Sequence, residues 1–318
     1  MAPHSDPPTP DLPTQLEPLI PFSLPFLPKP SPMWRAEMRA ILKGAAGSFL
    51  FGIPLLYTVE VWAIGSATGS GRLLGVQAVT FVVVLFLTQV EGFRRSLNIN
   101  PIETVLESIE ALGIGIICAA IALLLLRRIT LDTPLSEALG KLIFEGVPFS
   151  LGVTLARSTL DRRPSNQRRS LDSEPLLSGT AENVRDILRD TLVDIDATLI
   201  GAIVIAFSIA PTEEIAIIAS DLPPLWLLLV MSASILISYI IVYASGFTNR
   251  RERARRGLLL TPLTETLLAY VVVLLASALM LVFFQQLTFN SPWPEWLGNI
   301  IVLGLPASVG GAAGRILV

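Results

Sequence analysis

The chain has 318 residues, of which 52% are hydrophobic and 15% are charged, and its net charge at pH 7 is −3. An average soluble domain has about 25% charged residues, so this composition, with a mean hydropathy of +0.65, excludes an ordinary soluble globular protein. The single histidine, His4, and the single cysteine, Cys118, exclude Ser–His and Cys–His nucleophile pairs, His-rich metal sites and an internal disulfide framework. We therefore expect a membrane protein that is not an enzyme, has no cofactor and binds no nucleic acid.

Residues 1–32 contain eleven prolines and show little periodicity, which predicts a disordered, Pro-rich tail. The tail lacks the continuous apolar core of a signal peptide. Met33 comes directly before an interfacial segment that starts at Trp34, which makes this methionine a candidate translation start.

Eight apolar stretches follow, and each approaches the ~20 residues that a helix needs to cross a bilayer. The fourth is weakened by Glu145 and Pro148 and the eighth is rich in glycine, so six or seven spans is the competing interpretation. The predicted fold class is an all-α, polytopic transmembrane helical bundle, with spans near residues 44–65, 72–90, 105–126, 138–157, 189–210, 224–244, 264–285 and 298–317.

Positive charges are distributed unevenly over the connections between these spans. With the N-terminus inside, 19 of the 23 lysine and arginine residues fall on the inner side, and the outer side holds only Arg72, Arg127, Arg128 and Lys141. Basic connections resist translocation, and interfacial rings favour the membrane boundary, where four of the five tryptophans fall on the outer side. The sequence thus predicts that both termini are cytoplasmic.

The second half of the chain repeats the first. The pattern Gly-x-Pro-x-Ser-x-Gly at residues 146–152 recurs at 304–310, and an arginine follows each copy, Arg157 and Arg315. An even number of spans in each copy makes the two halves parallel. The predicted organisation is a transmembrane repeat at 33–160, a flexible Arg- and Ser-rich cytoplasmic linker at 161–187, and a second repeat at 188–318.

The repeated pattern has a structural and a functional interpretation. Small residues let helices approach closely, and proline with serine kinks a helix. The segment is therefore either a packing seam or a hinge that lines a path, and Arg157 and Arg315 are expected at the inner interface, where long basic side chains reach water. The residues concerned are Gly146, Pro148, Ser150, Gly152, Gly304, Pro306, Ser308 and Gly310.

Acidic residues inside the spans are candidates for ion or proton binding, because charge near the bilayer centre costs at least ~2.5–3.5 kcal/mol. Glu60 and Glu214 are equivalent in the two repeats and follow Thr58 and Thr212. Nearby prolines free backbone carbonyls, and oxygen ligands of this kind suit hard cations or a proton. The alternative is that both glutamates end their helices at the outer headgroup layer.

Two further carboxylates belong to the candidate set. Glu110 lies on one helical face with Glu103 and Glu107, which form either an acidic cytoplasmic vestibule or a first-turn stripe that complements the helix dipole. Glu145 aligns with Leu303 in the second repeat. The acidic residues are thus concentrated in the first half, which indicates that the halves have diverged in role.

Several residues together resemble a known family. The Thr58-x-Glu60 pair, the turn Glu91-Gly92-Phe93-Arg94-Arg95 and the Pro101-x-Glu103 helix start are similar to an uncharacterised bacterial family of multi-pass integral membrane proteins, a domain of unknown function. The resemblance covers the chain from about residue 34 onward. It implies a bacterial inner (cytoplasmic) membrane protein and no particular activity.

Two classes of function are consistent with these observations. The first is a small-solute or cation transporter or channel, H⁺-coupled through its membrane-embedded glutamates. The second is a non-transporting membrane scaffold or partner subunit. In either class the expected partners are the lipid bilayer, anionic lipid headgroups at the Arg-rich loops and, for a transporter, a cation or proton; an oligomer is compatible with both.

Overall fold

The computed structural model describes residues 32–95, 101–159, 180–244 and 262–317. Residues 1–31 of the predicted tail and residues 161–179 of the predicted linker lie outside these ranges. Most of the described residues are helical, and they include eight helices long and apolar enough to cross a membrane. The predicted all-α, multi-pass fold class is therefore confirmed.

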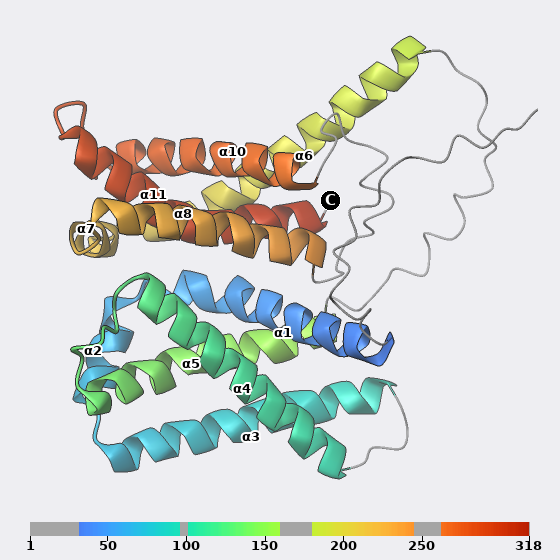
Figure 1. The fold of residues 1–318 in the computed structure, drawn as a ribbon, viewed down its shortest axis with the longest axis vertical. Coiled ribbons are helices and arrows are strands. Elements are labelled where there is room, and N and C mark those ends of the chain that lie inside the picture. Colours follow the sequence, from blue (N-terminus) through green and yellow to red (C-terminus); the bar gives the residue numbers. More distant parts are fainter. Residues whose placement is uncertain (1–31, 96–100, 160–179, 245–261, 318) are drawn as a thin grey trace, which may run out of the picture.

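The same order of helices occurs in each half: one long, one short, then three long (Figure 1). The first half contains α1 (Pro32–Leu56), α2 (Val59–Ala67), α3 (Ser70–Arg95), α4 (Pro101–Leu125) and α5 (Leu135–Thr159). The second contains α6 (Thr180–Ile209), α7 (Glu214–Ser220), α8 (Pro224–Tyr239) with its π-helical extension Ile240–Ala244, α10 (Pro262–Phe283) and α11 (Trp293–Leu317).

Two predicted boundaries differ from the structure. The first span, predicted at 44–65, is the apolar segment Ala36–Leu56, because the helix ends at Leu56 and the backbone of Thr58 is extended. Pro54 lacks an N–H group to continue the helical hydrogen bonds, which favours this break. The predicted linker extends to residue 187, whereas α6 already begins at Thr180, in a segment of good helix formers.

The ends of the bundle differ in structure. Both short helices, α2 and α7, lie at the left end in Figure 1, which we call the short-helix end, whereas α1 begins and α11 ends at the opposite, terminal end. The four basic residues predicted on the outer side start α3, follow α4 or lie near the start of α5, all at the short-helix end.

Glycine pairs let the last helix of each half, α5 or α11, pack closely against the first helix of that half, α1 or α6. A Cβ atom on Gly47 of α1 would lie 2.6 Å from the carbonyl oxygen of Gly152 of α5. In the second half, a Cβ atom on Gly201 of α6 would lie 2.9 Å from the carbonyl carbon of Gly310 of α11. The helices thus pack backbone to backbone, as small residues permit in membranes.

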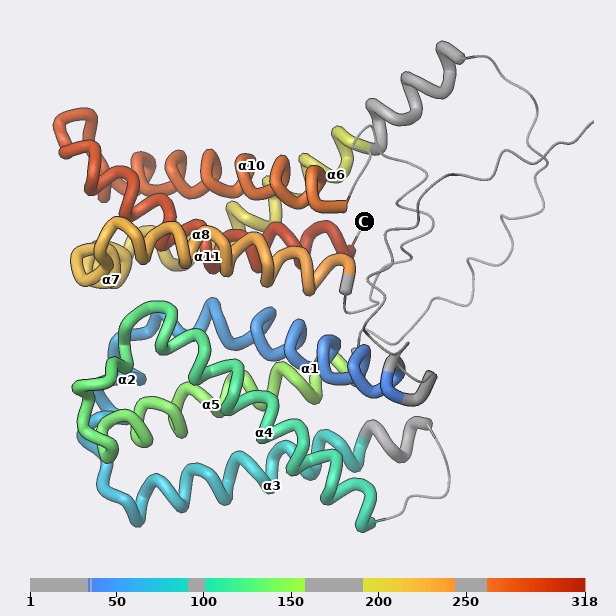
Figure 2. The backbone as a smooth tube through the Cα atoms, viewed as in Figure 1, coloured from blue at the N-terminus to red at the C-terminus, as the bar shows by residue number. Residues whose placement is uncertain are grey.

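The most buried membrane-spanning helix is α11, which lies among the helices of the second half (Figure 2). Of its most apolar window, 72% is buried, whereas the corresponding value for α3 is 22%. α11 packs against α6, α8 and α10 of its own half and against α1 of the other. α3 therefore lies at the margin of the bundle, whereas α11 lies in the centre of the second half.

Candidate functional site

Glu145 lies near the middle of α5 and is buried. It is about 15 Å along the helix axis from Leu135, the first residue of α5, at 1.5 Å per residue. The side chain is 0% exposed. Because α5 is long enough to span a membrane, this position corresponds to the interior of the bilayer, where an unpaired charge is costly.

Neither carboxyl oxygen of Glu145 has a hydrogen-bond partner among the described residues. The indole of Trp62 lies beside the carboxyl group, but its N–H donates to the backbone oxygen of Leu56 at 2.8 Å. One indole N–H cannot fully serve two acceptors, so the carboxyl group gains little from this neighbour. A buried polar group without a partner costs about 1–3 kcal/mol. The equivalent residue of α11, Leu303, is also 0% exposed, so packing alone does not require a carboxyl group here.

A polar pocket of about 380 Å³ lies at the short-helix end, on the side of Glu145 where α5 begins. We call it the short-helix pocket. Glu137 and Lys141 precede Glu145 by two turns and one turn on the same face of α5. Both residues line the pocket, as does Trp62, whose indole lies beside the Glu145 carboxyl group. The pocket is lined by residues of both halves, including Trp62, Arg127, Arg128, Glu137, Lys141 and Asp221.

Charged groups of the pocket form one ion pair between the two halves and one within the first half. Arg128, which follows α4, donates to the Asp221 carboxylate after α7 at 2.5 Å, and its guanidinium lies 5.1 Å from the ring centre of Trp62. Lys141 pairs with Glu137 at 2.6 Å and donates to the backbone oxygen of Arg128 at 3.0 Å. These contacts join the segment after α4 both to the segment after α7 and to α5.

The equivalent glutamates at the helix breaks are in different environments. Glu60 is exposed in the first turn of α2, and Thr58 before it is also exposed. Glu214 begins α7, is partly buried, and one of its carboxyl oxygens is buried without a hydrogen-bond partner among the described residues. Thr212 donates to the backbone oxygen of Ile209 at 2.7 Å. First-turn placement agrees with the interpretation that these glutamates end or begin helices.

Glu110 lies on α4, apart from Glu145. Its carboxylate accepts a hydrogen bond from Arg157 of α5 at 2.8 Å, and its side chain is 48% exposed. Glu103 and Glu107 are also exposed. The structure thus gathers Glu110 with a basic partner at the terminal end and does not bring it to the short-helix pocket.

The repeated Gly-x-Pro-x-Ser-x-Gly segments lie in the middle of α5 and α11. Gly152 and Gly310 make the close contacts with α1 and α6 described above, whereas Gly146 and Gly304 face side chains of α4 and α10. Pro148 and Pro306 lie inside their helices without ending them. Ser308 donates to the backbone oxygen of Leu305 at 2.7 Å, and the buried hydroxyl of Ser150 has no partner among the described residues.

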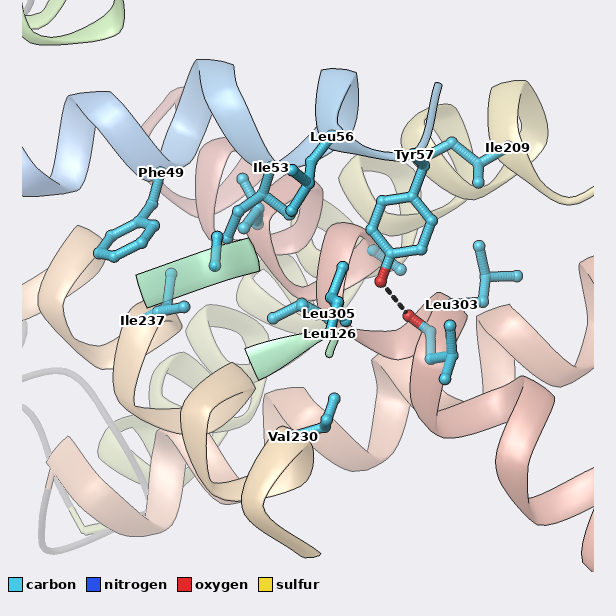
Figure 3. Packing of buried hydrophobic residues seen from close by; sticks show 14 of the residues in the cluster. Phe49, Ile53, Leu56, Tyr57, Leu126, Ile209, Val230, Ile237, Leu303 and Leu305 are labelled. Carbon is cyan, nitrogen blue, oxygen red and sulfur yellow. Dashed lines mark hydrogen bonds between the residues drawn. The ribbon is translucent and has the colours of Figure 1, made fainter. Parts of the chain in front are cut away.

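Pro306 explains a contact between the halves. A proline has no N–H, so the carbonyl of Val302, four residues earlier, loses its helical donor. The hydroxyl of Tyr57 donates to this carbonyl at 2.7 Å, from the break between α1 and α2 (Figure 3). Both residues lie in the buried core, so the hydrogen bond joins the two halves where water does not reach.

We expect Tyr57→Phe to destabilise the protein by about 1–3 kcal/mol, because it leaves the Val302 carbonyl buried and unpaired. Tyr270→Phe is the matched control, since the Tyr270 hydroxyl is buried without a hydrogen-bond partner among the described residues. Unfolding in detergent can be followed with a thiol-reactive dye, because Cys118 is the single cysteine and is buried. Equal stability of both variants would contradict this role of Tyr57.

The sequence does not mark Trp62, Tyr57 and Asp221 as parts of this region. Their partners are far away in the chain, so no local pattern identifies them. Arg127 and Arg128 carry a signal, as an arginine pair on the otherwise poorly basic outer side. The expectation that the Arg315 side chain reaches water at the inner interface is wrong. This side chain is 1% exposed and pairs with Glu265 of α10.

Comparisons with known proteins agree with the membrane fold. A family model described as "Putative integral membrane protein (DUF2391)" matches residues 40–318. No curated protein and no solved structure matches the chain. The match therefore supplies a family and a membrane location but no activity.

Proposed function

The chain belongs to this family of integral membrane proteins, and we propose that it is an H⁺-coupled small-solute or cation transporter or channel in which Glu145 binds the proton or cation. The observation that carries the proposal is the burial of Glu145 at mid-helix without a hydrogen-bond partner among the described residues. A carboxyl group removed from water is costly in its charged form, so it is suited to bind and release a proton or cation.

The surroundings of Glu145 support this role. Lys141, one turn before Glu145 on α5, lines the short-helix pocket, and Trp62 both lines the pocket and lies beside the carboxyl group. A proton that moves between the pocket and the carboxyl group would therefore pass this side chain. Transporter sites occur near the bilayer midplane at the interface of structural repeats, and Glu145 has this depth.

We further propose that the terminal end faces the cytoplasm of a bacterial inner membrane and that the halves arose by duplication. The positive-inside rule supports the orientation. The turns after α4 and α10 support the duplication: Arg127 and Gln285 have φ angles of 53° and 59° at corresponding positions. The next residues, Arg128 and Gln286, donate from their backbone N–H groups at 2.8 and 2.9 Å to carbonyls five residues earlier.

A membrane scaffold is the second candidate. It is favoured by the exposed, first-turn position of Glu60 and by the dense packing of α11, of which 72% of the apolar window is buried. A rigid core of this kind needs no transported ion. The two proposals differ in whether removing the Glu145 carboxyl group changes a flux.

The test is proton and cation flux in proteoliposomes that contain a pH-sensitive dye. We expect the wild type to dissipate an imposed pH gradient and Glu145→Gln to fall to the level of empty vesicles. Glu145→Leu, which copies Leu303 of the second half, should do the same with intact folding. Glu60→Gln is the matched control and should retain flux, because Glu60 is exposed.

Each contrary outcome is informative. Flux retained in Glu145→Gln but lost in Glu60→Gln would move the site to the break between α1 and α2. No flux from the wild type with H⁺, monovalent or divalent cations would overturn the transport proposal in favour of the scaffold. Protection of Cys118 from thiol reagents verifies that each variant is folded.

A further inference from the structure

We propose that the short-helix pocket binds a small oxyanion, a carboxylate or phosphate group, through Arg127, Arg128 and Lys141. Its role as the site where a transported substrate is first held rests on the proposed transport function, whereas the binding itself does not. The pocket volume of about 380 Å³ suits a small solute or the head of a larger one.

The charges of the pocket favour an anion over a cation. Three basic residues line it against two carboxylates, Glu137 and Asp221. Each carboxylate is already paired, Glu137 with Lys141 at 2.6 Å and Asp221 with Arg128 at 2.5 Å. A cation would therefore have to displace a basic side chain, while an anion would find a positive excess.

The basic side chains keep hydrogen-bond donors for a ligand. A guanidinium group carries five N–H donors and an ammonium group three. Arg127 makes one long contact, from Nη1 to the backbone oxygen of Asp221 at 3.5 Å. Arg128 donates from Nε to the backbone oxygen of Leu126 and from Nη2 to Asp221. Most donors of both guanidinium groups thus make no hydrogen bond to the described part of the chain.

Aromatic rings hold both guanidinium groups in place. Arg127 lies 5.7 Å from the ring centre of Trp226, and Arg128 lies 5.1 Å from that of Trp62. An arginine held over an aromatic ring loses less freedom when it binds an oxyanion in the two-pronged geometry that a planar fork allows. The arrangement is therefore prepared for a carboxylate or phosphate group.

The turn itself does not require these arginines. The second half forms the same turn after α10 with Gln285 and Gln286, with the same left-handed backbone and the same type of backbone hydrogen bond. Gln286 donates to the backbone oxygen of Pro211 at 3.1 Å and so fills a structural role without charge. The arginine pair of the first half is thus an addition to the turn, which is consistent with a ligand.

The test uses inorganic phosphate as the probe, with the full-length protein in a neutral detergent at constant ionic strength. We expect phosphate to raise the unfolding temperature of the wild type and chloride not to do so. Arg127→Gln, for which Gln285 is the natural precedent in this chain, should weaken phosphate binding at least tenfold, on the order of 1.4 kcal/mol. Arg72→Gln is the matched control, because it removes an exposed arginine at the same end.

A second arm distinguishes a soluble anion from a lipid headgroup, which presents the same phosphate chemistry. If inorganic phosphate has no effect but the wild type retains an anionic phospholipid that Arg127→Gln releases, the oxyanion site stands with lipid as its source. Binding that is unchanged in Arg127→Gln, or absent in both arms, would overturn the proposal. Phosphate binding without any flux from the wild type would leave the pocket intact and reject transport alone.

Discussion

Replacing Glu265 with alanine is expected to destabilise the protein by about 3–5 kcal/mol. Glu265, near the start of α10, forms an ion pair with Arg315 of α11, and the Arg315 side chain is 1% exposed. The same guanidinium donates to the hydroxyl of Tyr243 at 3.0 Å, from the π-helical end of α8. Without Glu265 the buried guanidinium loses this ion pair, so the folded state becomes less stable.

The first half provides the control for this prediction. Arg157 and Glu110 form the corresponding ion pair between α5 and α4, at 2.8 Å, but with exposed fractions of 20% and 48%. Exposed pairs contribute about 0–1 kcal/mol, so Glu110→Ala should have little effect. Equilibrium unfolding in mixed micelles, followed by Cys118 reactivity and tryptophan fluorescence, measures both variants. Equal losses would refute the assignment of Arg315 as a buried, charge-paired residue.

A double replacement separates charge from packing. Glu265→Leu with Arg315→Leu removes both charges, and a buried ion pair is often replaced by apolar residues at no cost. We expect this variant to be more stable than Glu265→Ala. If it is equally unstable, the loss in the single variant comes from missing packing contacts rather than from the broken ion pair.

The membrane spans can be predicted because hydropathy over about twenty residues is a local property. Seven of the eight predicted ranges overlap the observed helices closely, for instance 105–126 against Pro101–Leu125. The first predicted range, 44–65, is displaced because the apolar character continues through Trp62 while the helix does not. The break at Thr58 depends on the preceding Pro54 and on tertiary contacts such as that of Tyr57 with Val302.

Residues of the candidate site can be selected from the sequence but not ranked. Glu60, Glu110 and Glu145 are all acidic residues within or near predicted spans, yet only Glu145 of these three is 0% exposed. Burial depends on which helices surround a residue, and this is not encoded by the local pattern. Arg315 illustrates the same limit, since its partners Glu265 and Tyr243 come from two other helices.

The glycine contact between α6 and α11 gives the second prediction of a large loss of stability. Gly201→Ala is expected to cost about 3 kcal/mol, at the upper end for overpacking, because the new Cβ atom would overlap the carbonyl group of Gly310. Both partners in this contact are backbone, so neither can turn away as a flexible side chain would. The helices must separate, and α11, the most buried helix of the bundle, would lose contacts along its length.

A glycine outside the packing seam gives the opposite expectation. Gly113 lies inside α4, and a Cβ atom added to it would have no neighbour within 4 Å, so Gly113→Ala should be neutral or stabilising by up to about 1 kcal/mol through helix propensity. Gly47→Ala repeats the Gly201 test in the first half, where the Cβ would lie 2.6 Å from the Gly152 oxygen. Unfolding in mixed micelles compares the three. If Gly201→Ala and Gly47→Ala were as stable as Gly113→Ala, the glycines would not hold the helices of each half together, and their recurrence would instead favour a hinge at the seam.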